Sequence, residues 1–409
     1  MATTPRRRAV IALLLAEVIS TTGAEITTVA LPWFVLVTTG SPARMGSVLA
    51  AGFLGMAVLG IPSGRAATAV GPRRTMLIAD AACAPTIALI PILHWTGLLS
   101  FPIVLAVAFV VGAFFPAYTS SQSLVLASLV DEDEGRLVRT GALLGSFNET
   151  ASFVGPALGG VLVALLGAAP VLLIDAASYL VAFALVGSLV PAVHAEQSEP
   201  SQRTVRAGLR YIRGNRRLAR TVIGLAIVEL GFTAMIATLP VLTRQRYHAT
   251  ARVAGWLLAS YGAGSVAGGL LSTRARSVDG RTARLAIVAL ALTTWPLLLT
   301  LPSYGVAIAI AANGLFSGLF FPRFFASVTL RTPRALRARV SAAVNTAISA
   351  TGPIGFVGAG LLLQHASLRA TYAVVAGSAT VGAAIVVVAL SSPAQVGNPD
   401  AEPIKEGSR

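Results

Sequence analysis

The chain has 409 residues, of which 55% are hydrophobic and 11% are charged, and its formal net charge is +15. Soluble proteins carry about 25% charged residues, so this composition predicts a membrane protein with many spans. Because the basic residues lie in short loops between apolar runs, their excess does not indicate a nucleic-acid-binding protein.

The rarest residue types exclude further classes of protein. Cys83 is the only cysteine, so neither an intrachain disulfide nor a cysteine metal cluster can form. Lys405 is the only lysine, whereas the phosphate-binding loop of an ATPase needs a Gly-Lys pair. We therefore expect no metal, no cofactor, no enzymatic activity and no ATP-driven pump.

Apolar runs of the length of a membrane-spanning helix, about 20 residues, follow one another along the chain. They are predicted near residues 9–37, 43–63, 75–95, 99–124, 137–164, 169–191, 218–242, 252–273, 284–301, 304–328, 337–363 and 370–391. This pattern predicts an all-α membrane protein with twelve transmembrane helices. It divides the chain into a first half at 1–191, a basic linker at 192–217, a second half at 218–391 and a polar tail at 392–409.

The arginines favour one side of this predicted bundle. The loops opposite the N-terminus hold few basic residues, namely Arg44, Arg244, Arg246, Arg252 and Arg369. Loops rich in arginine and lysine stay in the cytoplasm, so both termini are expected to be cytoplasmic.

Several short motifs occur once in each half at matching positions. Gly23 and Leu31-Pro32 recur as Gly231 and Leu239-Pro240, and Gly112-Ala-Phe-Phe-Pro116 recurs as Gly318-Leu-Phe-Phe-Pro322. The pair Gly155-Pro156 is matched with Gly352-Pro353. Two parallel repeats of six helices are typical of secondary transporters, which bind substrate between the repeats. The repeat therefore predicts a transporter with two pseudo-symmetric halves.

The stretch 141–160 carries both polar and small residues inside an apolar run. Asn148 and Glu149 lie near its middle, and Gly155, Pro156, Gly159 and Gly160 follow. Small residues four apart allow two helices to approach closely in lipid, and proline bends a helix. We expect these four residues to serve packing and gating.

Carboxyl groups within the spans are the candidates for proton coupling. A charged carboxylate at the bilayer centre costs about 2.5–3.5 kcal/mol, so such a residue indicates function. Desolvation favours the neutral form, which allows a carboxyl group to take up and release a proton. Glu25 is the first candidate, followed by Glu17, Glu149 and Glu229.

A second set of residues is expected to line the substrate cavity. These side chains lie on the first, fourth, fifth, seventh and tenth predicted helices, and most are aromatic or amidated. They are Trp33, Phe114, Phe115, Tyr118, Gln122, Asn148, Phe232, Met235, Asn313, Phe316 and Phe320. Apolar walls with a few polar groups suit amphipathic ligands.

Together these segments resemble the major facilitator superfamily over nearly the whole chain, and most of all its bacterial drug:proton antiporter-like exporters, the macrolide and siderophore exporter group. The likeness rests on Gly23-Ala24-Glu25 with Val29–Trp33, on Gly155–Gly160, on Asp175–Tyr179 and on Gly208–Arg213. The resemblance implies twelve helices, alternating access, coupling to protons and a bacterial inner-membrane location.

The loop after the second predicted helix departs from the pattern of this superfamily. Where the pattern has an Asp-Arg pair, this chain has Thr68 and Ala69, although Gly71, Arg73 and Arg74 are present. Thr68 can cap a helix but cannot form a charged contact. We expect this loop to take part in gating, with Asp80 as the substitute for the missing acidic residue.

The sequence thus favours a monomeric secondary transporter that exports small amphipathic compounds, such as antibiotics, in exchange for protons. Its expected partners are a small-molecule substrate, protons and the bilayer, with no nucleic acid. Two alternatives remain open. One is an importer or an exporter of a single metabolite, and the other is a transporter-like sensor or assembly partner that moves nothing.

Overall fold

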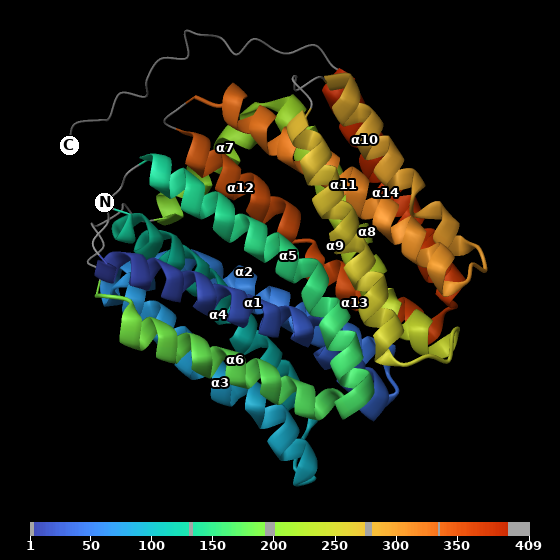
Figure 1. Cartoon of the computed structure of the whole chain (residues 1–409). Coiled ribbons are helices and arrows are strands. Elements are labelled where there is room, and N and C mark those ends of the chain that lie inside the picture. Colours follow the sequence, from blue (N-terminus) through green and yellow to red (C-terminus); the bar gives the residue numbers. More distant parts are fainter. Residues whose placement is uncertain (1–3, 131–133, 193–200, 275–279, 334–335, 392–409) are drawn as a thin grey trace, which may run out of the picture.

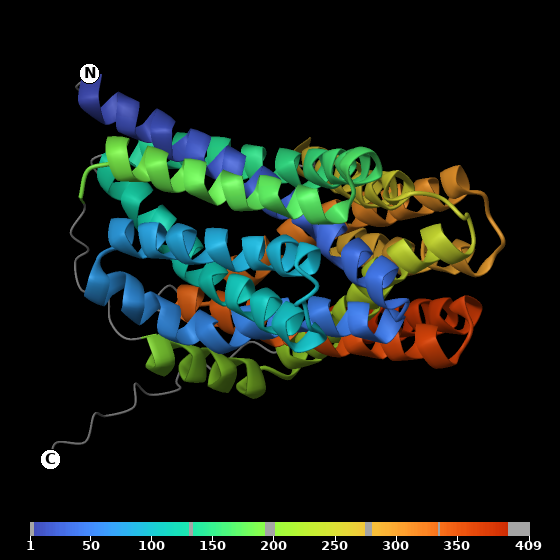
Figure 2. The same cartoon turned by 90° about the horizontal axis from the view of Figure 1, so that it is seen from below.

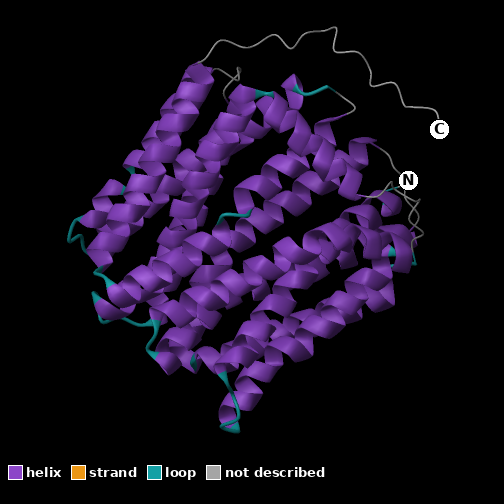
Figure 3. Ribbon diagram, turned by 180° about the vertical axis from the view of Figure 1, so that it is seen from behind, coloured by secondary structure: helices purple, strands orange, loops and turns teal. Residues whose placement is uncertain are grey.

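The computed structural model describes residues 4–130, 134–192, 201–274, 280–333 and 336–391. Within these residues the chain is built of helices joined by short loops, and no strand occurs (Figures 1 and 3). The helices of the first half are α1 (Thr4–Thr39), α2 (Pro42–Val70), α3 (Pro72–Trp95), α4 (Phe101–Leu129), α5 (Glu134–Leu166) and α6 (Ala168–Leu189). The remaining helices are α7 (Ser201–Gly214), α8 (Arg216–Gln245), α9 (Ala251–Arg274), α10 (Gly280–Leu292), the 3-10 helix η1 (Trp295–Leu298), α11 (Ser303–Arg331), α12 (Arg337–Ser349), α13 (Gly352–His365) and α14 (Leu368–Ser391).

The predicted all-helical membrane class is confirmed, whereas the number of spans stays a prediction. Among the described residues, nine helical stretches are long and apolar enough to cross a membrane, and α12 with α13 forms one of them. The other three predicted spans correspond to α2, α9 and α10 with η1. The described side chains of α2 form a shorter apolar stretch, Pro42–Val58, and α10 ends at Leu292 before a short 3-10 turn.

The predicted span at 337–363 is broken into α12 and α13. The break lies at Ala350 and Thr351, directly before Gly352-Pro353. Proline has no N–H to continue the helical ladder. The hydroxyl of Thr351 donates to the carbonyl of Ile348, and also to that of Ala226 on α8 at 2.9 Å. The break is therefore held against a neighbouring helix.

The two halves follow the same packing plan. In the first half, α1 packs on α5 and α6, α2 on α4, and α3 on α4 and α6. In the second half, α8 packs on α13 and α14, α9 on α11, and α10 on α11 and α14 (Figure 1). Gly23 of α1 faces Ser178 of α6, and Gly231 of α8 faces Ser378 of α14. The repeated glycines thus make equivalent helix contacts.

The contacts also correct the alignment of one repeated motif. Gly155 on α5 packs against Glu25 of α1, whereas Gly355 on α13 packs against Thr233 of α8. Glu25 and Thr233 are equivalent by the spacing of the Gly23 and Gly231 motifs. The structural counterpart of Gly155 is therefore Gly355, and the predicted match with Gly352 was about one helical turn too early.

The halves meet through glycines at one end of the molecule. Gly160 of α5 lies against Gly255 of α9, and Gly46 of α2 lies against Gly360 of α13. Ser41 also donates a hydrogen bond of 2.7 Å to the Oε1 atom of Gln364 beside the second contact. These contacts lie at the end of the bundle away from the start of α1, here called the far end (Figures 1 and 2).

The predicted linker contains the amphipathic helix α7, while residues 193–200 and the tail lie outside the described residues. Gly208 packs against the backbone of Arg339 and the methyl group of Ala343 on α12, and Ile212 on the same face is buried. Arg210 and Arg213 are exposed. The linker is thus attached to the second half through one apolar face.

Gly255→Ala tests the close contact between the halves. The added methyl group would overlap the carbonyl oxygen of Pro156 and crowd Gly160, so we expect a loss of about 1–3 kcal/mol in stability. Thermal unfolding of the purified full chain in detergent measures it. Gly269→Ala is the matched control, because nothing lies within 4 Å of its added methyl group. Equal melting temperatures for the two variants would contradict the contact.

Candidate functional site

A cavity of about 310 Å³ lies inside the first half, between α1, α2, α3, α4 and α6. Most of its wall is apolar, and its aromatic residues are Phe53, Phe114, Phe115, Tyr118 and Tyr179. Three carboxyl-bearing residues also line it, namely Glu17, Glu25 and Asp80. None of the described residues along this wall is arginine, lysine or histidine. This chamber, called here the first-half cavity, is thus acidic as well as apolar.

Two of these carboxyl groups form a buried pair. Glu17 on α1 is 4% exposed and Asp80 on α3 is fully buried. Thr21 donates to one oxygen of Glu17 at 3.1 Å, whereas the other oxygen of Glu17 and both oxygens of Asp80 have no hydrogen-bond partner among the described residues. The two carboxyl groups are electrostatic neighbours.

The position of Asp80 differs from the expectation that it closes the loop after the second helix. It lines the first-half cavity beside Glu17 and forms no hydrogen bond to an arginine within the described part of the chain. The reason is geometric, since Asp80 lies two turns into α3 on the face that packs inward. Asp80 is therefore a residue of the cavity.

The polar residues around Glu17 come from two further helices. Gln122 on α4 and Asn148 on α5 are neighbours of its carboxyl group. The hydroxyl group of Tyr118 on α4 is buried without a hydrogen-bond partner and is an electrostatic neighbour of both Glu17 and Asp80. The predicted residues Glu17, Gln122, Asn148 and Tyr118 are thus brought together.

Glu25 lies further along α1 than Glu17, toward the far end, at the contact with α5. Eight residues separate it from Glu17, which is about 12 Å along a helix axis. The hydroxyl of Ser152 on α5 donates to its Oε1 atom at 3.0 Å, and Gly155 packs against its Cβ atom. Glu25 therefore joins the first-half cavity to the helix that touches the second half.

Asp175, on α6, is buried but lies outside the cavity wall. Thr27 on α1 donates to its Oδ2 atom at 2.6 Å, and Ser178 donates to its Oδ1 atom at 3.3 Å. This carboxyl group is satisfied, so it acts as a clamp between α1 and α6.

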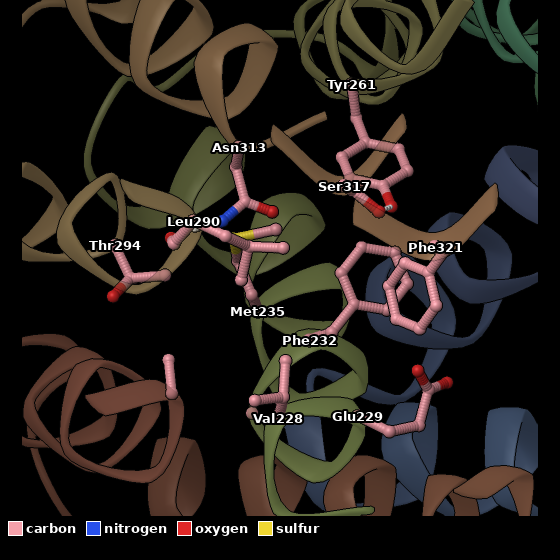
Figure 4. A pocket seen from close by; sticks show the side chains of 12 residues that line it. Val228, Glu229, Phe232, Met235, Tyr261, Leu290, Thr294, Asn313, Ser317 and Phe321 are labelled. Carbon is pink, nitrogen blue, oxygen red and sulfur yellow. Dashed lines mark hydrogen bonds between the residues drawn. The ribbon is translucent and has the colours of Figure 1, made fainter. Parts of the chain in front are cut away.

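A smaller cavity of about 50 Å³ lies inside the second half, and Glu229 lines it (Figure 4). The cavity also contains Phe232, Met235, Asn313 and Phe321. The amide of Asn313 donates to the carbonyl of Leu290 at 3.1 Å and to the hydroxyl of Thr293 at 3.0 Å. The phenol of Tyr261 shares a hydrogen bond of 3.0 Å with Ser317, and its ring packs on Phe232 at 4.8 Å.

The expected cavity residues therefore divide between two chambers, one in each half, rather than sharing one. Phe320 is fully buried and stacks on Phe324, so the prediction that it faces a cavity was wrong. Phe321 lines the chamber instead. Trp33 and Phe316 pack against the apolar cores without lining either cavity.

The predicted gating residues fall into two groups. Gly155, Pro156, Gly159 and Gly160 all lie where α5 contacts α1 or α9, and α5 continues through Pro156 as one helix. Gly71 turns the chain between α2 and α3 with φ of 95°, and the guanidinium of Arg73 donates to the carbonyl of Gly187 within the same half. Arg74 is exposed. The side chains of Thr68 and Glu149 lie outside the described part of the structure.

Some cavity residues were not anticipated from the sequence. They are Phe53, Tyr179, Tyr261, Ser317 and Phe321. Phe321 could have been predicted from the sequence, because the repeat matches it to Phe115, which lines the first-half cavity. The described residues contain no group of three or more histidine, cysteine, aspartate or glutamate residues arranged to hold a metal ion.

Comparison with known proteins gives one family and several relatives. Residues 2–405 match the family described as transmembrane secretion effector. The chain is 27% identical over 374 residues to the multidrug efflux pump Tap of Mycobacterium tuberculosis. The aligned region covers 88% of each of the two chains. It is 27% identical over 383 residues to Tap of Mycolicibacterium fortuitum, covering 90% of this chain and 93% of the relative.

Solved structures of transporters share the fold. The nucleoside transporter NupG superposes with a TM-score of 0.75 at 12% identity, covering 94% of this chain and 99% of the other. A bacterial homologue of the human lysosomal transporter Spinster, inward-facing and unoccupied, gives a TM-score of 0.67 at 15% identity, covering 95% of this chain and 96% of the other. These likenesses concern the fold alone.

Thr27→Val tests the clamp between α1 and α6. The variant keeps the shape of the side chain but removes the donor to Asp175, so we expect a loss of about 1–2 kcal/mol in stability. The measurement is thermal unfolding of the full chain in detergent. Thr86→Val is the control, since the hydroxyl of Thr86 donates within its own helix, to Ala82. If both variants unfolded at the same temperature, the hydrogen bond between Thr27 and Asp175 would make no measurable contribution to stability.

Proposed function

The chain belongs to the transmembrane secretion effector family and has the major facilitator fold, and from this we propose that it exports small amphipathic compounds in exchange for protons. A multi-pass membrane transporter, not an enzyme, is what the family and the relatives have in common. The relatives named as multidrug efflux pumps support the outward direction and the broad class of substrate.

The observation that carries this proposal is the first-half cavity. Its apolar and aromatic wall suits the hydrophobic body of an amphipathic molecule, and its few polar groups orient the ligand. Its three carboxyl-bearing residues supply groups that can bind and release a proton. A substrate site and a proton site are therefore adjacent.

Glu25 is the proposed link between proton binding and movement of the halves. Its ionised form accepts the hydrogen bond from Ser152 of α5, and protonation weakens that charge-assisted bond. The next turns of α5 carry Gly155, against Glu25, and Gly160, against Gly255 of the second half. A change at Glu25 thus acts on the helix that holds the halves together.

Alternating access requires the far-end contacts to open and close. In the described structure α5 meets α9 and α2 meets α13 at that end, so the halves are closed there. We assign the far end to the periplasmic side, because the opposite loops carry most of the arginines. One proton moving across 100 mV supplies about 2.3 kcal/mol, enough for a gradient of roughly 40-fold.

Glu25→Gln tests the coupling. In proteoliposomes with an imposed pH gradient, we expect wild-type protein to move members of a panel of labelled cationic and neutral antibiotics. The variant should lose at least about nine-tenths of gradient-driven movement, because the amide cannot exchange a proton. Exchange of labelled for unlabelled compound without a gradient should survive in the variant, and this controls for correct folding.

The other outcomes of this experiment are informative. Gradient-driven movement that survives Glu25→Gln would contradict the role of Glu25 and transfer it to Glu17, Glu149 or Glu229. Movement of no compound by the wild-type protein would contradict the proposed multidrug export and favour a transporter of a single metabolite or a non-transporting sensor.

The proposed orientation is tested by accessibility at the two ends. We expect a cysteine placed at the exposed Arg213 of α7, in a Cys83→Ser background, to react with an impermeant maleimide only after the cell membrane is opened. A cysteine at the exposed Arg252 of α9, at the far end, should react in intact cells. The reverse pattern would overturn the assignment.

A further inference from the structure

The Glu17–Asp80 pair presents three carboxylate oxygens without a partner in the part of the chain that the structure describes. Asp80 is fully buried, Glu17 is 4% exposed, and both line the first-half cavity. The unpartnered hydroxyl of Tyr118 adds a third polar group at the same place. The buried carboxyl group of Asp175, in contrast, accepts from two hydroxyl donors.

An unpaired buried carboxylate is expensive, so a group of this kind is paired with a positive charge or is neutral. No arginine, lysine or histidine of the described chain lines this cavity, so the protein there supplies no internal counter-ion. The charge that balances the pair must therefore come from a proton or from a bound cation. An anionic ligand is disfavoured by the same carboxyl groups.

We propose that Glu17 and Asp80 form the binding site for the positively charged group of an amphipathic substrate. This inference rests on the proposed function and specifies its substrate class as hydrophobic cations. The charged group lies between α1 and α3, and its apolar body extends along the cavity toward Glu25. Tyr118, Tyr179 and Phe114 offer aromatic faces, which attract cations through their ring quadrupoles.

Protons compete with such a cation for the pair. The titratable neighbours of the pair are Cys83 on α3, Tyr118 on α4 and Tyr179 on α6, and Glu25 of α1 lies on the same cavity wall. All of these are acids and none carries a positive charge, so cation binding should weaken as the pH falls.

The test is binding to the purified full-length chain in detergent, measured by equilibrium dialysis. The probe is tetraphenylphosphonium, whose charge is permanent at every pH, and the neutral comparison is chloramphenicol. We expect Asp80→Asn and Glu17→Gln each to weaken tetraphenylphosphonium binding about 30-fold. Chloramphenicol binding should stay near the wild-type value, which also shows that the variants are folded.

Two further variants separate a binding role from a structural one. Asp80→Glu keeps the charge and should restore most of the cation binding lost in Asp80→Asn. Asp175→Asn removes a buried carboxyl group of the same half that already has hydrogen-bond donors, and it should leave tetraphenylphosphonium binding near the wild-type value. The wild-type protein should bind this probe less tightly as the pH is lowered, and Asp80→Asn should lose most of that dependence.

Three results would overturn the inference: no binding of tetraphenylphosphonium to the wild-type protein, unchanged binding in Asp80→Asn and Glu17→Gln, or an equal loss of the charged and the neutral probe. Selective cation binding without gradient-driven movement in vesicles would instead refute the proposed function and leave the site intact. Proton-driven movement of neutral compounds alone would support export and refute the cation site.

Discussion

The close approach of helices at glycines along α5 is the constraint on which the rest of the structure depends. Gly155 lets α5 contact Glu25 on α1, and Gly160 lets the same helix touch Gly255 on α9 in the other half. Without a hydrophobic driving force in lipid, helices associate through such close packing and through hydrogen bonds between them. The helix α5 therefore makes both the contact to the acidic cavity and the contact between the halves. It can thus couple proton binding at Glu25 to movement of the halves.

A second constraint is the cost of charge inside an apolar bundle. The hydrogen bonding differs from one carboxyl group to the next. Asp175 accepts from two hydroxyl groups, Glu25 accepts from the hydroxyl group of Ser152, and Asp80 has no donor among the described residues. Asp175 joins two helices outside the first-half cavity, whereas Glu25 and Asp80 both line that cavity, Glu25 with a donor from α5 and Asp80 without one.

The two halves repeat their packing but not their chemistry. The equivalent of Glu25 in the second half is Thr233, which donates to its own helix at Glu229 and packs on Gly355. The second-half cavity is smaller, about 50 Å³ against about 310 Å³, and its amide and hydroxyl groups are already paired. Among the described residues, the first-half cavity is thus the larger one and has three carboxyl-bearing residues in its wall, whereas the second-half cavity has Glu229 alone.

By itself the sequence determined the membrane class, the helical architecture, the repeat and the set of carboxyl groups. Apolar runs, arginine-rich loops and charged residues within apolar runs can all be recognised from the order of residues along the chain. Only the tertiary structure decided which side chains meet, since that depends on helix rotation and on contacts between distant segments. It turned Phe321 and not Phe320 toward a cavity, aligned Gly155 with Gly355, and placed Asp80 beside Glu17 although 62 residues lie between them in the chain. Neighbouring residues on a helix point about 100° apart, so one can line a cavity while the next lies in the core. No local pattern in this chain specifies how each helix is rotated about its axis.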